Sequence, residues 1–185
     1  MKKIILFLIT LSTLLFSREA IIKEILSENM ILIDQNGVTK RAQLAGIALF
    51  ANTNSENKKI SYKDREKLHK EAMNYLLENL PIGAKIKFIK IDNENSGPEY
   101  IWPVIGGEEL NYLMVKHGYA LLDRDNPYLL GMFYMRLNRA MGYAKEKRLG
   151  LWKDNFEIMN SLAKNQNRHK NKRDELLNLL QKQIK

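Results

Sequence analysis

The dipeptide Asn36-Gly37 constrains the fold of this chain more than any other short feature, because it lies between two apolar runs and marks a two-residue β-hairpin. Runs rich in isoleucine and leucine occupy residues 21–26 and 30–34, and a third strand is expected after the hairpin, up to about Ile47. Short runs of this composition are typical of strands. The first part of the chain therefore predicts three consecutive strands.

A helix is predicted after a polar loop at residues 52–60. Ser61 and Asp64 resemble a capping box, since the serine hydroxyl can accept from an N-terminal amide and the acid suits the positive helix end. Pro81 with Gly83 ends the helix. Apolar positions at intervals of three and four predict one buried stripe; they are Leu68, Ala72, Met73, Leu76, Leu77 and Leu80.

A second strand pair is predicted at residues 85–91 and 100–105, where Pro103 has no amide donor and belongs at an edge or a bulge. Two further helices are expected at residues 110–117 and 128–148, each followed by glycine. The order predicts a mainly β protein with α-helices. We expect a five-stranded barrel of the oligonucleotide-binding type, capped by three helices, with a C-terminal helical extension.

The first 17 residues have the pattern of a signal peptide or an N-terminal anchor. Two lysines precede an apolar run at residues 4–16, which is shorter than the roughly 20 residues of a transmembrane helix. Cleavage after Ser17 or after Ala20 and an uncleaved anchor all stay open. We therefore expect an exported chain, periplasmic, secreted or anchored, with a barrel domain at residues 18–154 and a basic extension at 155–185.

The formal net charge of +9 favours an anionic partner, such as nucleic acid or an anionic membrane surface. The chain has no cysteine, which excludes disulfides, a thiolate nucleophile and a cysteine-based metal site. The three histidines, His69, His117 and His169, show no metal-ligand spacing, and we interpret them as uninvolved in a site.

Three segments resemble staphylococcal nuclease-like proteins. The sequence NYLMVKHGYA at residues 111–120 resembles the family's Asn-x-x-Leu-Val-x-x-Gly-x-Ala helix. A closing motif that ends in Gly-[Ile/Leu]-Trp is matched at residues 144–152, and QLAGI at residues 43–47 falls where the family has Arg-Leu-x-Gly-Ile. The resemblance covers residues 20–154 in one consistent order.

In an active member, the resemblance implies a calcium ion held by two aspartates, a glutamate that activates water and two arginines that clamp the phosphate. Here the first aspartate falls on Glu28 or Asn29, depending on a one-residue register choice. The remaining positions are degenerate: the second aspartate, the glutamate and the two arginines fall on Ala48, Ala51, Gln43 and close to Pro98. We therefore expect no catalytic residue, no bound metal and no cofactor.

Basic side chains outside the family motifs are the candidate contacts to nucleic acid. Arg41 lies two residues before Gln43 and so on the same strand face. Residues 164–185 carry seven basic and two acidic side chains, with leucines at helical spacing, which is typical of a basic amphipathic helix. The full candidate set is Arg41, Lys85, Lys87, Lys90, Lys164, Arg168, Lys170, Lys172 and Arg173.

Two classes of function follow from the sequence. The favoured one is a non-catalytic module that binds nucleic acid or another macromolecule of the envelope, such as a protein. The alternative is a divergent nuclease with a site rebuilt from residues such as Glu28, Arg41, Asp92 and Glu99. The absent base and arginines favour the first, since they supply most of the rate enhancement expected of such a site.

Overall fold

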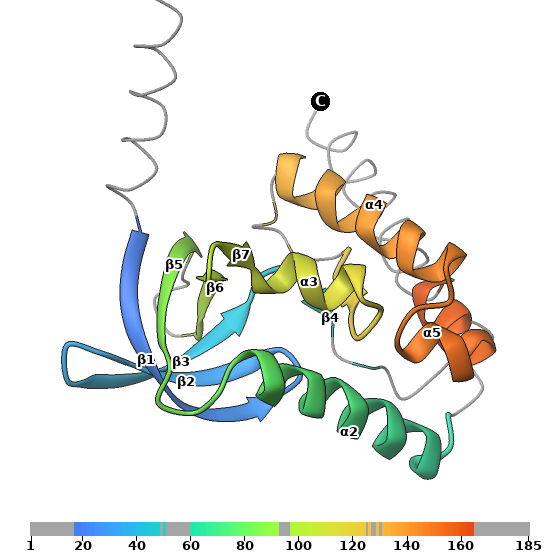
Figure 1. Cartoon of the computed structure of the whole chain (residues 1–185), viewed down its shortest axis with the longest axis horizontal. Helices are drawn as coiled ribbons and strands as arrows, with labels where there is room; N and C mark the ends of the chain where they lie inside the picture. The colour runs from blue at the N-terminus through green and yellow to red at the C-terminus, as the bar shows by residue number, and fades with distance from the viewer. Residues whose placement is uncertain are drawn as a thin grey trace, which may run out of the picture.

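A closed barrel of five strands forms the body of the protein (Figure 1). The computed structural model describes residues 17–48, 50, 60–92, 97–124, 126, 129 and 131–164. The barrel strands are β1 (Ser17–Ser27), β2 (Met30–Gln35), β3 (Val38–Leu44), β5 (Lys85–Asp92) and β6 (Glu99–Ile105). They pair in the order β3-β2-β1-β5-β6, and parallel pairing of β3 with β6 closes the ring. The predicted oligonucleotide-binding type of barrel is confirmed.

Strand β1 begins at Ser17, four residues before the predicted strand start. Arg18 and Ala20 are in register with Phe88 and Ile86 of β5, and Ala20 is buried. The sequence did not indicate this extension because Arg18 and Glu19 interrupt the apolar pattern. Pairing with β5, which is distant in sequence, holds these polar residues in the sheet.

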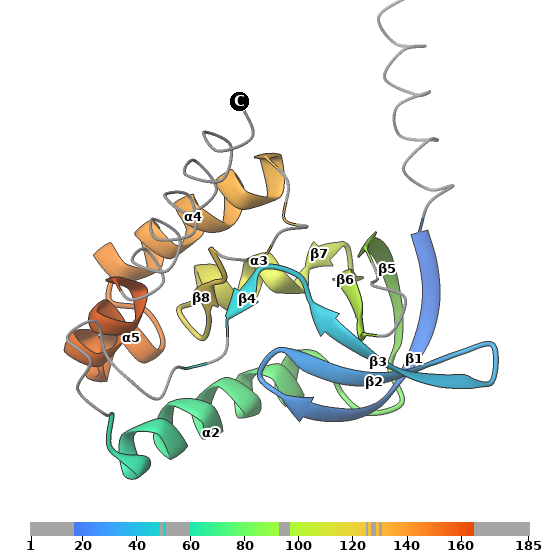
Figure 2. The same cartoon turned by 180° about the vertical axis from the view of Figure 1, so that it is seen from behind.

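The third strand is shorter than predicted, because the chain turns at Ala45 and Gly46 and does not continue to residue 47. Gly46 has a φ of +74°, and a Cβ there would lie 2.7 Å from side-chain atoms of Leu129 and Leu137. After the turn, β4 (Ile47–Ala48) pairs with β8 (Leu121–Leu122). Figure 2 shows this small sheet between the barrel and the helices that follow.

Five helical segments complete the described fold. Four are α2 (Tyr62–Asn79), α3 (Leu110–Lys116), α4 (Gly131–Glu146) and α5 (Leu151–Asp154). Residues 156–164 form the fifth, separated from α5 by Asn155. The Ser61 hydroxyl accepts from the Asp64 amide, as predicted. Among the described residues, no helix is long and apolar enough to cross a membrane.

Two details of the predicted helices are wrong. Leu77 was expected in the buried stripe of α2 but is 41% exposed, because the stripe is narrower and runs through Leu68, Ala72, Leu76 and Leu80. Helix α4 ends at Glu146, not at residue 148, because Arg148 has a positive φ and the Leu149 amide bonds back to the Ala144 carbonyl.

The predicted position of Pro103 is explained by the pairings of β6. Pro103 is in register with Phe88 of β5. On the other edge of β6, pairing with β3 ends at Ile101, and pairing with β7 (Glu108–Glu109) begins at Val104. Pro103 therefore occupies a short gap on that edge, where its missing amide donor costs no ladder hydrogen bond.

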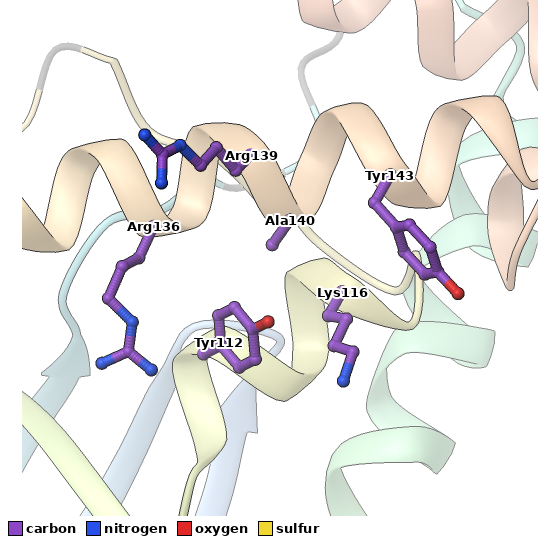
Figure 3. Close-up of a pocket in the computed structure, with 6 residues that line it drawn as sticks. All are labelled: Tyr112, Lys116, Arg136, Arg139, Ala140 and Tyr143. Atoms are coloured by element: carbon purple, nitrogen blue, oxygen red, sulfur yellow. The ribbon is translucent and has the colours of Figure 1, made fainter.

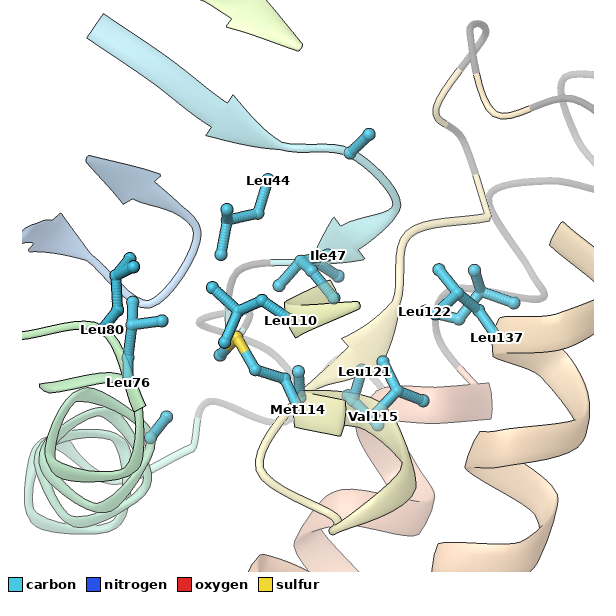
Figure 4. Close-up of a cluster of buried hydrophobic side chains, with 14 of the residues drawn as sticks. Leu44, Ile47, Leu76, Leu80, Leu110, Met114, Val115, Leu121, Leu122 and Leu137 are labelled. Carbon is cyan, nitrogen blue, oxygen red and sulfur yellow. The ribbon is translucent and has the colours of Figure 1, made fainter. Parts of the chain in front are cut away.

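The barrel strands and the helices contribute to one continuous hydrophobic core. Figure 4 shows Leu76 of α2 and its C-cap Leu80 near Leu44, Leu110 and Met114. Asn111, which begins the first family-like motif, is fully buried in this region, and its amide donates to the Ala45 carbonyl at 2.7 Å and to the Ile101 carbonyl at 3.3 Å. This side chain links α3 to the turn that follows β3 and to strand β6.

Candidate functional site

The row of side chains that crosses the outer face of the barrel at Gln43 is neutral. Gln43 is in register with Met30 of β2 on one side and with Tyr100 of β6 on the other. All three side chains are half-buried. In the staphylococcal nuclease-like pattern this position holds a phosphate-clamping arginine, whereas this chain presents a row of one amide, one thioether and one phenol.

Asn29 lies in the turn between β1 and β2 and is buried. Its side-chain amide donates to the Ile47 carbonyl at 3.1 Å, and its side-chain oxygen accepts from the Ser27 hydroxyl at 3.0 Å. Its backbone carbonyl accepts from the Leu44 amide. Asn29 therefore connects this turn to the segment that follows β3 through a hydrogen bond. Its side-chain oxygen already accepts a hydrogen bond from Ser27.

Glu28, the other residue in the register choice, points to helix α2. One carboxylate oxygen accepts from the Phe50 amide at 3.3 Å, and the other lies 2.8 Å from His69 Nδ1. The Glu28 side chain is 6% exposed and that of His69 is 48% exposed. The sequence did not indicate this contact, because 41 residues separate His69 from Glu28 and no local pattern joins them.

A cavity of about 240 Å³ adjoins this pair. Its lining residues are Glu28, Phe50, Tyr62, Arg65, Glu66 and His69. Because the Glu28 carboxylate holds Nδ1, it orients the imidazole as a carboxylate does in many acid–base pairs.

The remaining degenerate positions hold side chains that cannot act as an acid, a base or a metal ligand. Ala48 is buried and pairs with Leu121. Pro98 is half-buried and precedes Glu99, which is in register with Ala42. Ala51 lies outside the described residues. Arg41 is exposed on the face that also carries Gln43, as the sequence indicated.

These residues do not fit a calcium ion, which takes six to eight oxygen ligands. The Asn29 side-chain oxygen accepts from Ser27, Ala48 offers a methyl group, and the Glu28 carboxylate faces His69 and Phe50. Within the part of the chain that the structure describes, no three His, Asp or Glu side chains lie together as metal ligands.

Glu99 binds three cations at one mouth of the barrel. Its Oε1 lies 3.0 Å from Lys40 Nζ, 3.8 Å from an Arg18 nitrogen and 4.0 Å from Lys90 Nζ. Each of the four residues lies two positions from a buried strand residue and so faces the barrel interior. Lys90, a predicted nucleic-acid contact, is therefore engaged in an internal cluster.

The other predicted strand lysines lie beside Glu19 of β1. Lys85 Nζ is 2.7 Å from the Glu19 carboxylate, and Lys87 is in register with Glu19. The hydrogen bond and the positive charge of Lys85 hold the pKa of the Glu19 carboxyl below its usual value. These lysines are exposed, but the acid offsets part of their charge.

Glu28 and Glu99 are the two acids of the expected rebuilt nuclease site whose side chains the structure describes. They have different partners. Glu28 contacts Phe50 and His69, whereas Glu99 contacts the three cations of the barrel mouth. The Asp92 side chain lies outside the described residues. In the extension, Lys164 is exposed; Arg168, Lys170, Lys172 and Arg173 also lie outside the described part.

Comparison with known proteins gives no identification. No family model matches the chain, and no curated protein matches it.

Proposed function

We propose that this chain is a staphylococcal nuclease-like barrel that binds nucleic acid without cutting it. The order of strands and helices and the three family-like motifs support the family, and the net charge of +9 supports an anionic partner. The observation that carries the proposal is the neutral row Met30, Gln43 and Tyr100, where the family clamps phosphate.

The chemistry of cleavage explains why this row matters. Hydrolysis of a phosphodiester develops negative charge on the phosphate, and cations or a metal placed at that charge provide much of the rate enhancement. An amide, a thioether and a phenol supply no full positive charge there. Ala48 and the hydrogen-bonded Asn29, at two further family positions, also fail to support hydrolysis, while the support for binding is the net charge of +9.

We also propose that the chain is exported, with residues 1–17 as its signal. The start of β1 bears on the cleavage position. A cut after Ala20 would remove Arg18, Glu19 and Ala20, which pair with β5, whereas a cut after Ser17 keeps them. N-terminal sequencing of protein recovered from the envelope or medium of an expressing bacterium tests this, and Arg18 is the expected first residue.

The function is tested by a gel-shift titration beside a digestion assay. The full chain is titrated into labelled single-stranded DNA and RNA at about 50 and 200 mM salt, and affinity should fall steeply with salt. The same substrates are incubated with calcium, magnesium or manganese, and we expect no shortening above background. Absence of a shift at both salt concentrations contradicts the proposal, and so does any protein-dependent cleavage.

The alternative, a divergent phosphodiester hydrolase, is favoured by one observation. The buried Glu28 carboxylate orients the His69 imidazole beside a cavity that Arg65 also lines. Adding EDTA to the digestion assay distinguishes this alternative from a metal-dependent nuclease, because cleavage by the Glu28–His69 pair should persist in EDTA and metal-dependent cleavage should stop. Cleavage by the wild type that is lost in both Glu28→Gln and His69→Gln would support the hydrolase and overturn the binding-only proposal.

A further inference from the structure

Helices α3 and α4 line a groove on the described surface (Figure 3). Its volume is about 540 Å³, which lies within the roughly 300–1,000 Å³ of small-ligand sites. The lining residues are Tyr112, Lys116, Arg136, Arg139, Ala140 and Tyr143. The sequence did not indicate this set as a site, because the residues come from two helices that only the fold brings together.

Helical spacing places these residues on one face of each helix. Tyr112 and Lys116 are four apart on α3. Arg136, Arg139 and Tyr143 are three and four apart on α4. Residues at these intervals are neighbours on a helix surface. The facing surfaces of α3 and α4 therefore present three cations and two phenols to the same groove.

The groove keeps an excess of positive charge. Arg136 is paired with Glu109, at 2.7 Å between a guanidinium nitrogen and a carboxylate oxygen. Among the described residues, neither Lys116 nor Arg139 has an acidic oxygen within ion-pair distance. Two cations are thus left to attract an anion, and none of the described lining residues is an acid that would repel one.

The two tyrosines have different roles. The Tyr112 ring has Arg136 at 5.1 Å and Lys116 at 5.5 Å from its centroid, so cations already occupy its surroundings. Tyr143 is 48% exposed. Figure 3 shows its ring extending from α4 beside Lys116, whereas Arg139 lies along α4. Tyr143 is the aromatic surface available to a ligand.

We propose that this groove binds single-stranded nucleic acid, with a base stacked on Tyr143 and phosphates bound by Lys116 and Arg139. The inference rests on the proposed function and assigns its site. Stacking on tyrosine requires an unpaired base, and a groove that combines cations with an exposed aromatic ring is typical of single-strand binding. The strand lysines are weaker candidates because Glu19 and Glu99 lie next to them.

The test measures fluorescence anisotropy of a labelled oligothymidylate with the full chain and three variants. Tyr143→Ala should weaken binding about 5- to 150-fold, the range expected for one stacked base, while Tyr143→Phe should retain it. The double variant Lys116→Ala/Arg139→Ala should weaken binding and reduce the slope of log affinity against log salt by about 1.4, for two phosphate contacts.

A matched control comes from α2, which lies apart from α4 with α3 between them (Figure 1). Lys63→Ala/Lys70→Ala removes the same charge from exposed positions that line neither the groove nor the cavity beside His69. This double variant should bind as the wild type does. Thermal melts of all variants should be unchanged, since the substituted side chains are half-buried or exposed.

Each outcome bears on a different claim. If the wild type binds and the groove and control variants lose equal affinity, binding is diffuse and the groove assignment is wrong. If the groove variants lose binding to phosphatidylglycerol vesicles but keep binding to the oligonucleotide, the groove is a lipid site and the assignment is wrong. If the wild type does not bind the oligonucleotide at all, the proposed function fails with it.

Discussion

Trp152 is a fully buried residue of α5, and its indole lies against Gly118, the glycine that ends α3. The Phe156 ring is 6.0 Å away, centroid to centroid. Large aromatic side chains bury more apolar area than any others, so such a residue fixes the position of the elements around it. Trp152 thereby connects the end of the barrel domain to the first helical residues of the extension.

Trp152→Ala should therefore lower the free energy of unfolding by about 3 to 5 kcal/mol, from lost burial and the cavity left behind. Urea unfolding at neutral pH measures the change, with the exposed Tyr62→Ala as the control. A melting temperature unchanged by the Trp152 substitution would contradict both this packing and the match of residues 144–152 to the family's closing motif.

Tyr75 is a half-buried residue of α2 whose hydroxyl lies 2.7 Å from His117 Nδ1 and whose ring stacks on Tyr119. Burial raises the pKa of Tyr75 to about 12, and the nearby Tyr119, Glu108 and Glu78 add to the shift. Between pH 10 and pH 12 the folded chain thus keeps a proton that the unfolded chain has lost.

Stability should consequently fall as pH rises through this range, because the folded state binds more protons than the unfolded state. Water screens a half-buried group, so the Tyr75 contribution should be of the order of 1 kcal/mol. Urea midpoints measured from pH 9 to pH 12 should decline less steeply for Tyr75→Phe than for the wild type or Tyr62→Phe. Equal declines in all three proteins would show that Tyr75 is not the group responsible.

At the scale of elements, the end of α3 and the start of α5 meet backbone to backbone. The Leu151 amide donates to the Gly118 carbonyl at 3.1 Å. A Cβ on Gly118 would lie 2.2 Å from the Leu149 carbonyl oxygen, and one on Gly150 would lie 2.4 Å from the His117 carbonyl oxygen. The two family-like motifs, more than twenty residues apart in sequence, are therefore in direct contact through their glycines.

Gly118→Ala should destabilise the fold by about 3 kcal/mol or more, because it adds a backbone clash to a left-handed φ of +83°. Gly107→Ala is the matched control, since its φ is +89° but a Cβ at this position would meet no atom within 4 Å. Gly107→Ala should lower the free energy of unfolding by about 1 kcal/mol, which is the cost of the left-handed backbone conformation alone. Thermal unfolding separates the two, and equal losses would mean that the close approach is absent.

Local sequence signals predicted most elements, since each depends on residues close in the chain. The Asn36-Gly37 hairpin formed as expected, with Asn36 at a φ of 55° and Gly37 at 82°. The errors at Ser17 and Gly46 have a different cause. Pairing with β5 extends β1, and the side chains of Leu129 and Leu137 favour a glycine at the turn, so both features depend on segments distant in sequence.

The features of the candidate site also divide into those that the local sequence indicates and those that depend on segments distant in sequence. The departures from the staphylococcal nuclease-like pattern at Gln43 and Ala48 were evident from the sequence motifs alone. The Glu28 to His69 contact and the groove between α3 and α4 were not, because each joins helices or turns that are separated by tens of residues. The acidic neighbours of Lys85 and Lys90 were also not evident from the local sequence, because they come from other strands.

At the scale of the whole molecule, the basic extension and the groove can both attract a polyanion. Met159 and Leu162, within the helical residues 156–164, are buried, so this part belongs to the folded body. Deleting residues 165–185, which lie outside the described part, should leave the barrel folded, because every described strand and helix ends by residue 164. The deletion should also reduce the slope of log affinity against log salt for oligonucleotide binding. The reduction should correspond to a few phosphate contacts, at about 0.7 for each contact with a single strand.

The truncated chain should still lose affinity on Tyr143→Ala, because the stacking contact lies in the groove and not in the extension. If truncation abolishes binding at all salt concentrations, the extension is the main contact. If truncation changes neither affinity nor slope, the extension plays no part in binding.

The central claim is that the barrel binds a nucleic acid strand and leaves it intact. The most direct test uses one sample: end-labelled single-stranded DNA is incubated with the full chain and calcium, run on a native gel, and the shifted band is then excised and run on a denaturing gel. We predict a shifted band whose DNA has its original length. A shifted band that contains shortened DNA would contradict the account, and so would the absence of any shift.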